Sequence, residues 1–252
     1  MPDNRIPIGV QLYSIRTDCA KDLPGSLAAV AKMGYKGIEY AGYHNRSAKE
    51  LRKMQDDLGI KCCGTHIGLD TLQGDNLQKT MDFNRELGNI YLVMPGLPKD
   101  MYEKSKWLDT AKVFNEISDK VKAQGFKLGY HNHSHEFAGA EPDTFWEGLW
   151  KNTKPEVFLQ FDIGNAMHGG ANPISYLRRH KGRSVTIHLK PFSKANPAAA
   201  VGADEVNWQE IFEVCEKSGG TKWYIVEHES DPVSPMEAVR KCIEGLKKLG
   251  KV

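Results

Sequence analysis

Short apolar segments alternate with longer amphipathic segments along this chain of 252 residues, and the alternation repeats eight times. The short segments are rich in β-branched and aromatic residues, a composition typical of strands that pack against neighbours on a pleated surface. We therefore expect strands at residues 6–13, 37–40, 60–67, 89–94, 127–132, 157–162, 184–190 and 222–228.

The segments between the expected strands carry apolar residues every three or four positions, which predicts amphipathic helices. The clearest pattern covers residues 110–124 and is followed by Gly125. Glycine commonly ends a helix because it adopts the left-handed backbone conformation that the helix C-terminus needs. Similar helices, each followed by glycine, are expected at residues 23–33, 48–58, 77–87 and 208–217.

The order strand, helix, glycine, new strand defines a βα unit, and successive units of this kind make the strands parallel. Eight units close most simply into a (β/α)₈ barrel, whose typical length of about 250 residues matches this chain. An open doubly wound sheet is the alternative, but no Gly-x-Gly-x-x-Gly motif follows the first strand. We predict one (β/α)₈ barrel domain over residues 1–252, with a flexible loop at residues 193–207 as a candidate lid.

The charged residues and the cysteines argue against several classes of protein. Lys and Arg total 34 against 32 Asp and Glu, and they are scattered, so neither a nucleic-acid surface nor a membrane surface is expected. The five cysteines form no Cys-x-x-Cys pair and are expected to be reduced and mostly buried. No apolar run reaches membrane-span length, and residues 1–5 carry no apolar leader, so a cytoplasmic protein is expected unless a presequence has been removed.

Polar residues accumulate where the expected strands end, which is the end of such a barrel that carries the chemistry. Because side chains alternate along a strand, His188 and Lys190 share one face of the seventh strand, and His131 and His133 share one face of the fifth. The full set of polar strand-end residues is Gln11, Tyr13, Glu39, His66, His131, His133, Asp162, His188, Lys190 and Glu227.

Three neighbouring strands end in Asp162, His188 and Glu227, and His131 stands beside them on the fifth strand. This mixed nitrogen and oxygen set suits Mn²⁺, Zn²⁺, Co²⁺ or Fe²⁺ better than Ca²⁺, and it leaves open positions for substrate oxygens. Taken alone, each residue is explained as readily as a helix cap, a buried histidine or a partner of Lys190. Four such residues on consecutive strands favour a metal site.

At these residues the sequence resembles the sugar phosphate isomerase/epimerase superfamily of xylose isomerase-like TIM barrels. The resemblance spans essentially the whole chain, and the order and spacing of its short motifs make it fairly specific. The motifs that carry it lie at residues 11–16 (QLYSIR), 37–40 (GIEY), 130–133 (YHNH), 161–165 (FDIGN), 188–190 (HLK) and 226–227 (VE).

The resemblance implies one divalent metal, bound by Glu, Asp, His and Glu at the ends of strands five to eight. Asp162, His188 and Glu227 match the last three positions, whereas His131 stands where many members have glutamate. That glutamate often acts as a base paired with the strand-eight glutamate, so the departure bears on the reaction. Mn or Zn is the metal we expect first, with Co, Fe or Mg as alternatives.

The function expected first is a metal-dependent sugar isomerase or epimerase that abstracts an α-proton beside a metal-bound carbonyl, giving an enediolate. The alternative is a lyase or dehydratase that eliminates from a keto-sugar or inosose with the same site. An endonuclease IV-like nuclease is opposed by the near-zero charge and the single Asp–His–Glu set. A non-catalytic sugar-binding barrel is favoured only by the missing strand-five glutamate.

The expected catalytic residues are Glu227, His133 and Lys190. His131 serves either as metal ligand or as base. If His131 is a ligand, His133 or His66 becomes the better proton carrier. Glu227 is the other candidate base, and Lys190 would stabilise the enolate charge.

Substrate contacts are expected from residues around the barrel mouth, namely Tyr13, Glu39, His66, Glu136, Asn165 and Trp208. Glu39 could instead hydrogen-bond a ligand histidine, and Glu136 could orient His133 or remain a solvated charge. The expected partner is a small-molecule sugar or keto-sugar, unphosphorylated because no glycine-rich phosphate cradle is obvious after strands seven and eight. Barrels that resemble this one commonly form homo-oligomers.

Overall fold

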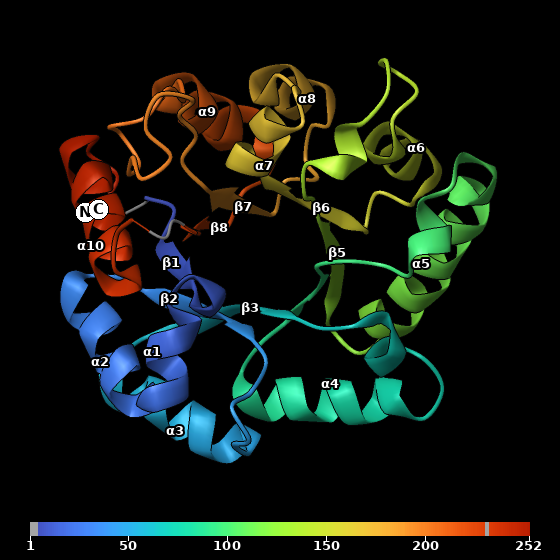
Figure 1. Cartoon of the computed structure of the whole chain (residues 1–252). Helices are drawn as coiled ribbons and strands as arrows, with labels where there is room; N and C mark the ends of the chain where they lie inside the picture. The colour runs from blue at the N-terminus through green and yellow to red at the C-terminus, as the bar shows by residue number, and fades with distance from the viewer. Residues whose placement is uncertain (1–4, 230–231) are drawn as a thin grey trace.

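Eight parallel strands close into a barrel in the order β1 to β8, and the helices surround it (Figure 1). The computed structural model describes residues 5–229 and 232–252. Residues 1–4, part of the segment 1–5 that we expected to carry no apolar leader, lie outside that range. The predicted (β/α)₈ fold is confirmed. The strands are β1 (Ile8–Gln11), β2 (Gly37–Ala41), β3 (Lys61–His66), β4 (Tyr91–Met94), β5 (Lys127–His131), β6 (Phe158–Asp162), β7 (Thr186–Leu189) and β8 (Trp223–Val226).

The helices lie on the outside of the barrel, between consecutive strands. The α-helices are α1 (Arg16–Lys21), α2 (Leu23–Met33), α3 (Ala48–Leu58), α4 (Asn76–Leu87), α5 (Trp107–Lys122), α6 (Phe145–Asn152), α7 (Ile163–His168), α8 (Pro173–Arg179), α9 (Trp208–Val214) and α10 (Pro235–Lys248). Short 3₁₀ turns are η1 (Leu12–Ile15), η2 (Leu69–Leu72), η3 (Lys99–Tyr102), η4 (Lys104–Lys106) and η5 (His135–Phe137), and α9 continues as a π-helical turn, η6 (Cys215–Gly219).

Local capping explains why several helices begin and end at the predicted residues. Ser47 and Glu50 form a reciprocal capping box at the start of α3, which satisfies backbone N–H groups that the helix itself leaves free. Gly34, Gly59 and Gly88 follow α2, α3 and α4 with φ values of 111°, 65° and 81°, the left-handed conformation that ends a helix. Among the described residues, no helix is long and apolar enough to cross a bilayer.

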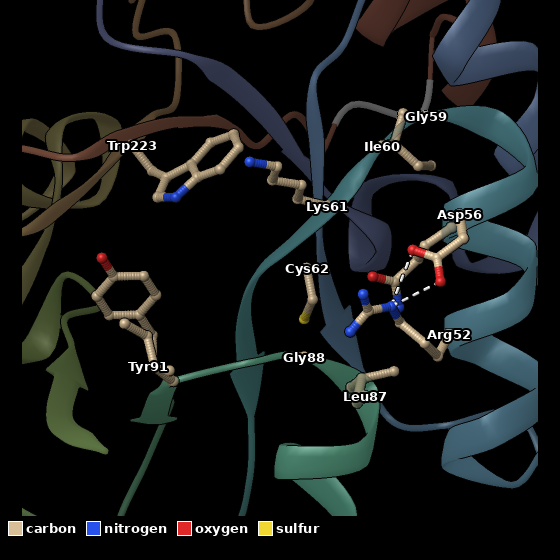
Figure 2. Close-up of a pocket in the computed structure, with 12 residues that line it drawn as sticks. Arg52, Asp56, Gly59, Ile60, Lys61, Cys62, Leu87, Gly88, Tyr91 and Trp223 are labelled. Atoms are coloured by element: carbon tan, nitrogen blue, oxygen red, sulfur yellow. Dashed lines mark hydrogen bonds and ion pairs between the residues drawn. The ribbon is translucent and has the colours of Figure 1, made fainter. Parts of the chain in front are cut away.

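Large aromatic side chains pack at the amino-terminal end of the barrel over glycines of other strands. A β-carbon at Gly37 would lie 2.7 Å from the Trp223 ring, and one at Gly129 would lie 2.4 Å from the Phe158 ring. Outside this packing, a cavity of about 570 Å³ is lined in part by Tyr91, Lys61 and Trp223 (Figure 2). The packed end leaves the opposite, carboxyl-terminal end for the polar residues.

The close approach of Phe158 makes Gly129→Ala a test of this packing. We expect the added methyl group to displace the ring and to lower the free energy of unfolding by about 1–3 kcal/mol. Urea denaturation would measure the change. Gly96→Ala is the matched control, because a β-carbon there would meet only the Tyr102 hydroxyl at 3.8 Å. Equal midpoints for the two variants would contradict the packing argument.

The segment 193–207 between β7 and α9, predicted from the sequence as a flexible loop and candidate lid, contacts the rest of the barrel at several residues. Val201 is buried, and Gly245 in α10 packs so close that a β-carbon there would lie 1.8 Å from the Val201 carbonyl oxygen. Asp204 accepts hydrogen bonds from the backbone of Phe192 and Gly202 and from the indole of Trp208. These contacts hold the segment against the barrel. As predicted, all five cysteines are free thiols and buried.

Candidate metal and active site

Four residues from consecutive strand ends meet at the carboxyl-terminal end of the barrel. His131, Asp162, His188 and Glu227 each offer one ligand atom, and these atoms lie within 4.8 Å of one another. The register of β6 and β7 pairs Asp162 directly with His188, and Glu227 follows β8 immediately. All four are buried. The structure thus brings together the four residues that the sequence predicted as metal ligands.

Two polar atoms of this cluster are buried without a hydrogen-bond partner. They are Asp162 Oδ2 and His188 Nδ1. His188 Nδ1 lies 2.9 Å from Glu227 Oε2, near enough for charge attraction, but the geometry is not that of a hydrogen bond. Leaving buried polar atoms unsatisfied costs about 1–3 kcal/mol each. A divalent cation bound between them would satisfy both atoms, so the cluster fits a metal.

The opposite nitrogen of His188 contacts a wholly buried carboxylate. Its Nε2 lies 2.6 Å from Glu39 Oε2. Burial alone would lower the pKa of His188, but the facing carboxylates of Glu39, Asp162 and Glu227 raise it well above its usual range. A carboxylate behind a ligating histidine is a common arrangement in metal sites, because it fixes the ring and increases its basicity.

His131 has the opposite electrostatic environment. Burial, together with the neighbouring rings of His188 and His66, lowers the pKa of His131 well below its usual value. The ring is therefore neutral, which is the form that binds a metal. Its Nδ1 lies 3.1 Å from Gln160 Oε1. These contacts suit His131 to the role of ligand better than to that of an accessible base.

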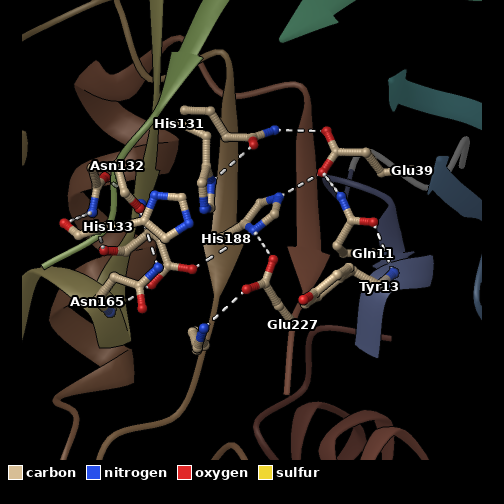
Figure 3. Close-up of polar contacts among 12 residues, drawn as sticks. Gln11, Tyr13, Glu39, His131, Asn132, His133, Asn165, His188 and Glu227 are labelled. Carbon is tan, nitrogen blue, oxygen red and sulfur yellow. Dashed lines mark hydrogen bonds and ion pairs between the residues drawn. The ribbon is translucent and has the colours of Figure 1, made fainter. Parts of the chain in front are cut away.

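A cavity of about 550 Å³ opens onto the cluster. His133 is the most accessible of the lining histidines, with 46% of its side chain exposed, whereas His66 is only 8% exposed. Figure 3 shows His133, His131, His188 and Glu227 around the same space. The lining residues are Tyr13, Ala41, His66, Pro95, His131, His133, Glu227 and Glu229.

Lys190 lies between two carboxylates beside the cluster. Its ammonium group is 2.9 Å from Glu227 Oε1 and 2.6 Å from Glu229 Oε1. Burial would lower the pKa of Lys190, but these carboxylates and Asp162 raise it well above its usual range. Burial likewise would raise the pKa of Glu227, but Lys190 and His188 lower it well below the usual value. The pair therefore stays charged.

Glu136 is wholly buried rather than a solvated charge. It accepts a hydrogen bond from the Tyr130 hydroxyl at 2.6 Å and another from the backbone N–H of His133 at 2.9 Å. Tyr130 in turn is 2.9 Å from the Tyr102 hydroxyl. Glu136 thus orients the His133 segment. This is one of the roles that the sequence analysis offered as an alternative to substrate binding.

Besides Glu136, three predicted substrate contacts do not line the cavity. Glu39 is buried beneath the cluster, and its contact with His188 matches the second role predicted for it. Asn165 donates its side-chain amide to the Asn132 carbonyl and its backbone N–H to Asp162, so it ties two strand ends together. Trp208 is buried and bonded to Asp204. Tyr13 and His66 do line the cavity.

Several polar residues of the site were not singled out from the sequence. Glu229 lines the cavity two residues beyond Glu227, and Gln160 lies two residues before Asp162 on the same strand. The period of two along a strand was the available signal for both. The sequence places Gln11 at a strand end, but it gives no sign of the hydrogen bond that Gln11 donates to Glu39 at 2.8 Å.

Comparisons with known proteins agree with this barrel fold. The family described as Xylose isomerase-like TIM barrel matches residues 27–249. An inosose dehydratase from Clostridium tetani is 22% identical over 257 aligned positions, which cover 86% of each chain. A sugar phosphate isomerase/epimerase structure from Parabacteroides distasonis has 25% identity and a TM-score of 0.84, covering 98% of this chain and 97% of that one.

A structure of an L-ribulose 3-epimerase shares the fold at 15% identity, with a TM-score of 0.71 and coverage of 97% and 94%. These matches confirm the resemblance predicted from the sequence motifs. The proteins matched include enzymes named as dehydratase, isomerase and epimerase. The chain belongs to the xylose isomerase-like TIM barrel family, and it is an enzyme of the superfamily in which isomerases, epimerases and lyases share this barrel.

Proposed function

We propose that this enzyme is a metal-dependent lyase that removes water from a neutral polyhydroxylated ketone, such as a keto-sugar or an inosose. The observation that carries the proposal is the distribution of groups around the cavity. Among the described lining residues, the carboxylates Glu227 and Glu229 follow β8, whereas the titratable groups on the β3 and β5 side are imidazoles. The similarity to inosose dehydratases supports the same reaction.

The cavity chemistry favours elimination over epimerisation by paired carboxylates. A two-carboxylate epimerisation needs one acid group on each face of the substrate, and the strand-five position that would supply the second holds His131. Elimination needs only one mobile proton carrier beside the carbon that loses its proton. Isomerase or epimerase activity, the function expected first from the sequence, remains the second candidate, since His133 and Glu227 both line the cavity.

Asp162, His188, Glu227 and His131 are the residues that would hold one divalent metal, with Mn or Zn as the proposed identity. When bound, the metal would act as a Lewis acid toward the substrate carbonyl. The fit rests on the buried, unpartnered atoms of Asp162 and His188 and on the mixed nitrogen and oxygen donor set.

The proposed proton carrier is His133. Its exposed imidazole takes the proton from the carbon next to the carbonyl; the C–H electron pair forms the C=C bond of an enolate, and the carbonyl π pair moves onto its oxygen. The carbonyl then re-forms, the C=C pair becomes the double bond between the α and β carbons, and the C–O pair leaves with the β-hydroxyl, which takes the proton back from His133, so water leaves and the base is regenerated. Glu136 holds the backbone of His133 during both transfers. Lys190 keeps Glu227 ionised.

Product analysis tests the proposal directly. We would incubate the Mn²⁺-loaded enzyme in D₂O with inososes, 3-keto-sugars and ketoses, and follow the products by NMR. A lyase gives loss of one water and an unsaturated or diketone product. Deuterium at the α-carbon of an intact epimer would overturn the lyase proposal in favour of an isomerase or epimerase. If neither reaction nor metal binding is observed, both the lyase and the isomerase or epimerase candidates are excluded.

The charges around the cavity also predict discrimination against phosphorylated substrates. The described lining residues include two carboxylates and no lysine or arginine. Of the nearby cations, Lys190 is paired with both carboxylates, and Arg16 lies 3.9 Å from Glu229. A like-charge penalty of about 1.4 kcal/mol is enough to lower kcat/KM tenfold. We therefore expect a substrate phosphate ester to react at least about tenfold less efficiently than the free compound. Equal kcat/KM values for the two compounds would contradict the charge argument.

A further inference from the structure

We propose that Gln160 is a positioning residue that, together with Glu39, determines which nitrogen of His131 and of His188 faces the metal cluster. The inference rests on the proposed function in so far as the cluster binds metal. The inference is drawn from the donor and acceptor of each hydrogen bond in a buried network. The first group in that network is a backbone N–H, which can only donate.

The network starts at the backbone N–H of Tyr13, which can only donate. It lies 3.0 Å from Gln11 Oε1, so the oxygen of that amide faces Tyr13. The amide nitrogen of Gln11 must then face the other way, and it donates to Glu39 Oε2 at 2.8 Å. Figure 3 shows Gln11 between Tyr13 and Glu39. The orientation of Gln11 is thus fixed by the main chain.

Glu39 accepts hydrogen bonds from several directions. Besides Gln11, its carboxylate lies 2.6 Å from His188 Nε2 and 3.1 Å from His66 Nε2. It fits closely against β3, because a β-carbon at Gly64 would lie 2.2 Å from Glu39 Oε1. A carboxylate can only accept, so His188 carries a proton on Nε2. The nitrogen of His188 that faces Asp162 and Glu227 is therefore Nδ1.

The orientation of the Gln160 amide determines which nitrogen of His131 donates a hydrogen bond. Its amide nitrogen donates to Glu39 Oε1 at 2.7 Å and to Thr186 Oγ1 at 2.9 Å. The flipped amide would bring its oxygen to 2.7 Å from a carboxylate oxygen, which is repulsive. Gln160 Oε1 therefore faces His66 Nε2 at 2.8 Å and His131 Nδ1 at 3.1 Å, and both ring nitrogens donate.

His131 consequently carries its proton on Nδ1 and keeps the lone pair on Nε2. The two histidines of the cluster present opposite ring nitrogens, and a single network sets both. Glutamine suits position 160 because it donates to a carboxylate and accepts from an imidazole at once. Glutamate there would face Glu39 with like charge, and an apolar side chain would leave the Nδ1–H of His131 without an acceptor.

The test is the tautomer of His131 in the metal-free protein. With ¹⁵N-labelled histidine, long-range ¹H–¹⁵N correlation spectra distinguish the two neutral tautomers, and the His131 signal is assigned by its absence in His131→Gln. We expect the wild-type ring to be the Nδ1–H form. Gln160→Met keeps the chain length but removes the acceptor; we expect it to lose the single tautomer and to weaken Mn²⁺ binding about 10–100-fold by calorimetry.

Thr186→Val is the matched control. It removes a different partner of the same amide and leaves Gln160 Oε1 in place, so the His131 tautomer should remain Nδ1–H. An Nε2–H tautomer in the wild type, or unchanged tautomer and Mn²⁺ affinity in Gln160→Met, would overturn the proposal. The expected tautomers in a protein that binds no metal would support this hydrogen-bond assignment while overturning the proposed function.

Discussion

The His188→Ala variant is expected to lose high-affinity divalent metal binding altogether. The substitution removes Nδ1, which lies 2.9 Å from Glu227 and 3.7 Å from Asp162, and it also leaves the Glu39 carboxylate buried without its closest partner. Metal content after dialysis, together with calorimetric titration with Mn²⁺, would measure the loss. A variant that still retains one equivalent of metal would contradict the proposed site.

The lost contact with Glu39 can also destabilise the fold, so a second variant separates metal binding from folding. Asp162→Asn preserves the side-chain oxygen that accepts the backbone N–H of Asn165 at 2.6 Å, yet it removes the charge that faces the cluster. We expect a folded protein by circular dichroism with greatly weakened metal binding. His180→Ala is the control: it removes another buried histidine, which stacks on Trp150 outside the cluster, and metal binding should persist.

Replacing His133 with glutamine is expected to leave metal binding intact and to lower kcat about 10²–10⁴-fold, the usual contribution of a general acid–base group. His133 lines the cavity but is not one of the four clustered residues. Its backbone N–H is held by Glu136 whatever the side chain, so the local structure should survive. Steady-state kinetics and metal content on the same preparation separate the two effects.

His135→Gln provides the matched control for His133. The two rings stack with centroids 5.9 Å apart and have comparable exposure, at 54% and 46% of their side chains, but His135 does not line the cavity. Its kcat should stay close to the wild-type value. Metal loss in His133→Gln would mean that His133 and not His131 is the fourth ligand, and unchanged kcat would place the proton carrier elsewhere.

The fold was predictable because its signals are local. Strand periodicity located all eight strands, and glycines such as Gly34 and Gly59 marked helix ends to the residue. The contacts of the segment 193–207 were not predictable, because one of them involves Gly245, which lies far along the chain and packs against Val201. α5 likewise begins three residues before the predicted start, at Trp107, whose indole donates to the Tyr102 carbonyl.

The clustered residues were predictable for a similar reason, whereas their supporting network was not. Side-chain alternation and strand-end position identified Asp162, His188 and Glu227, and the resemblance agreed. The contact between Gln160 and Glu39 joins residues 121 positions apart, and it exists only because the barrel closes. Residue type at either position gives no indication of the partner, so the hydrogen-bond polarity had to come from the structure.

The aromatic packing of Trp223 and Phe158 over Gly37 and Gly129 has a kinetic consequence. Because the described interior side chains are buried, as in other (β/α)₈ barrels, we expect the cavity at the other end to have a single entrance. Reactant and product must then use the same entrance in turn. Product should therefore compete with substrate for the free enzyme, raising the apparent KM without changing kcat as it accumulates.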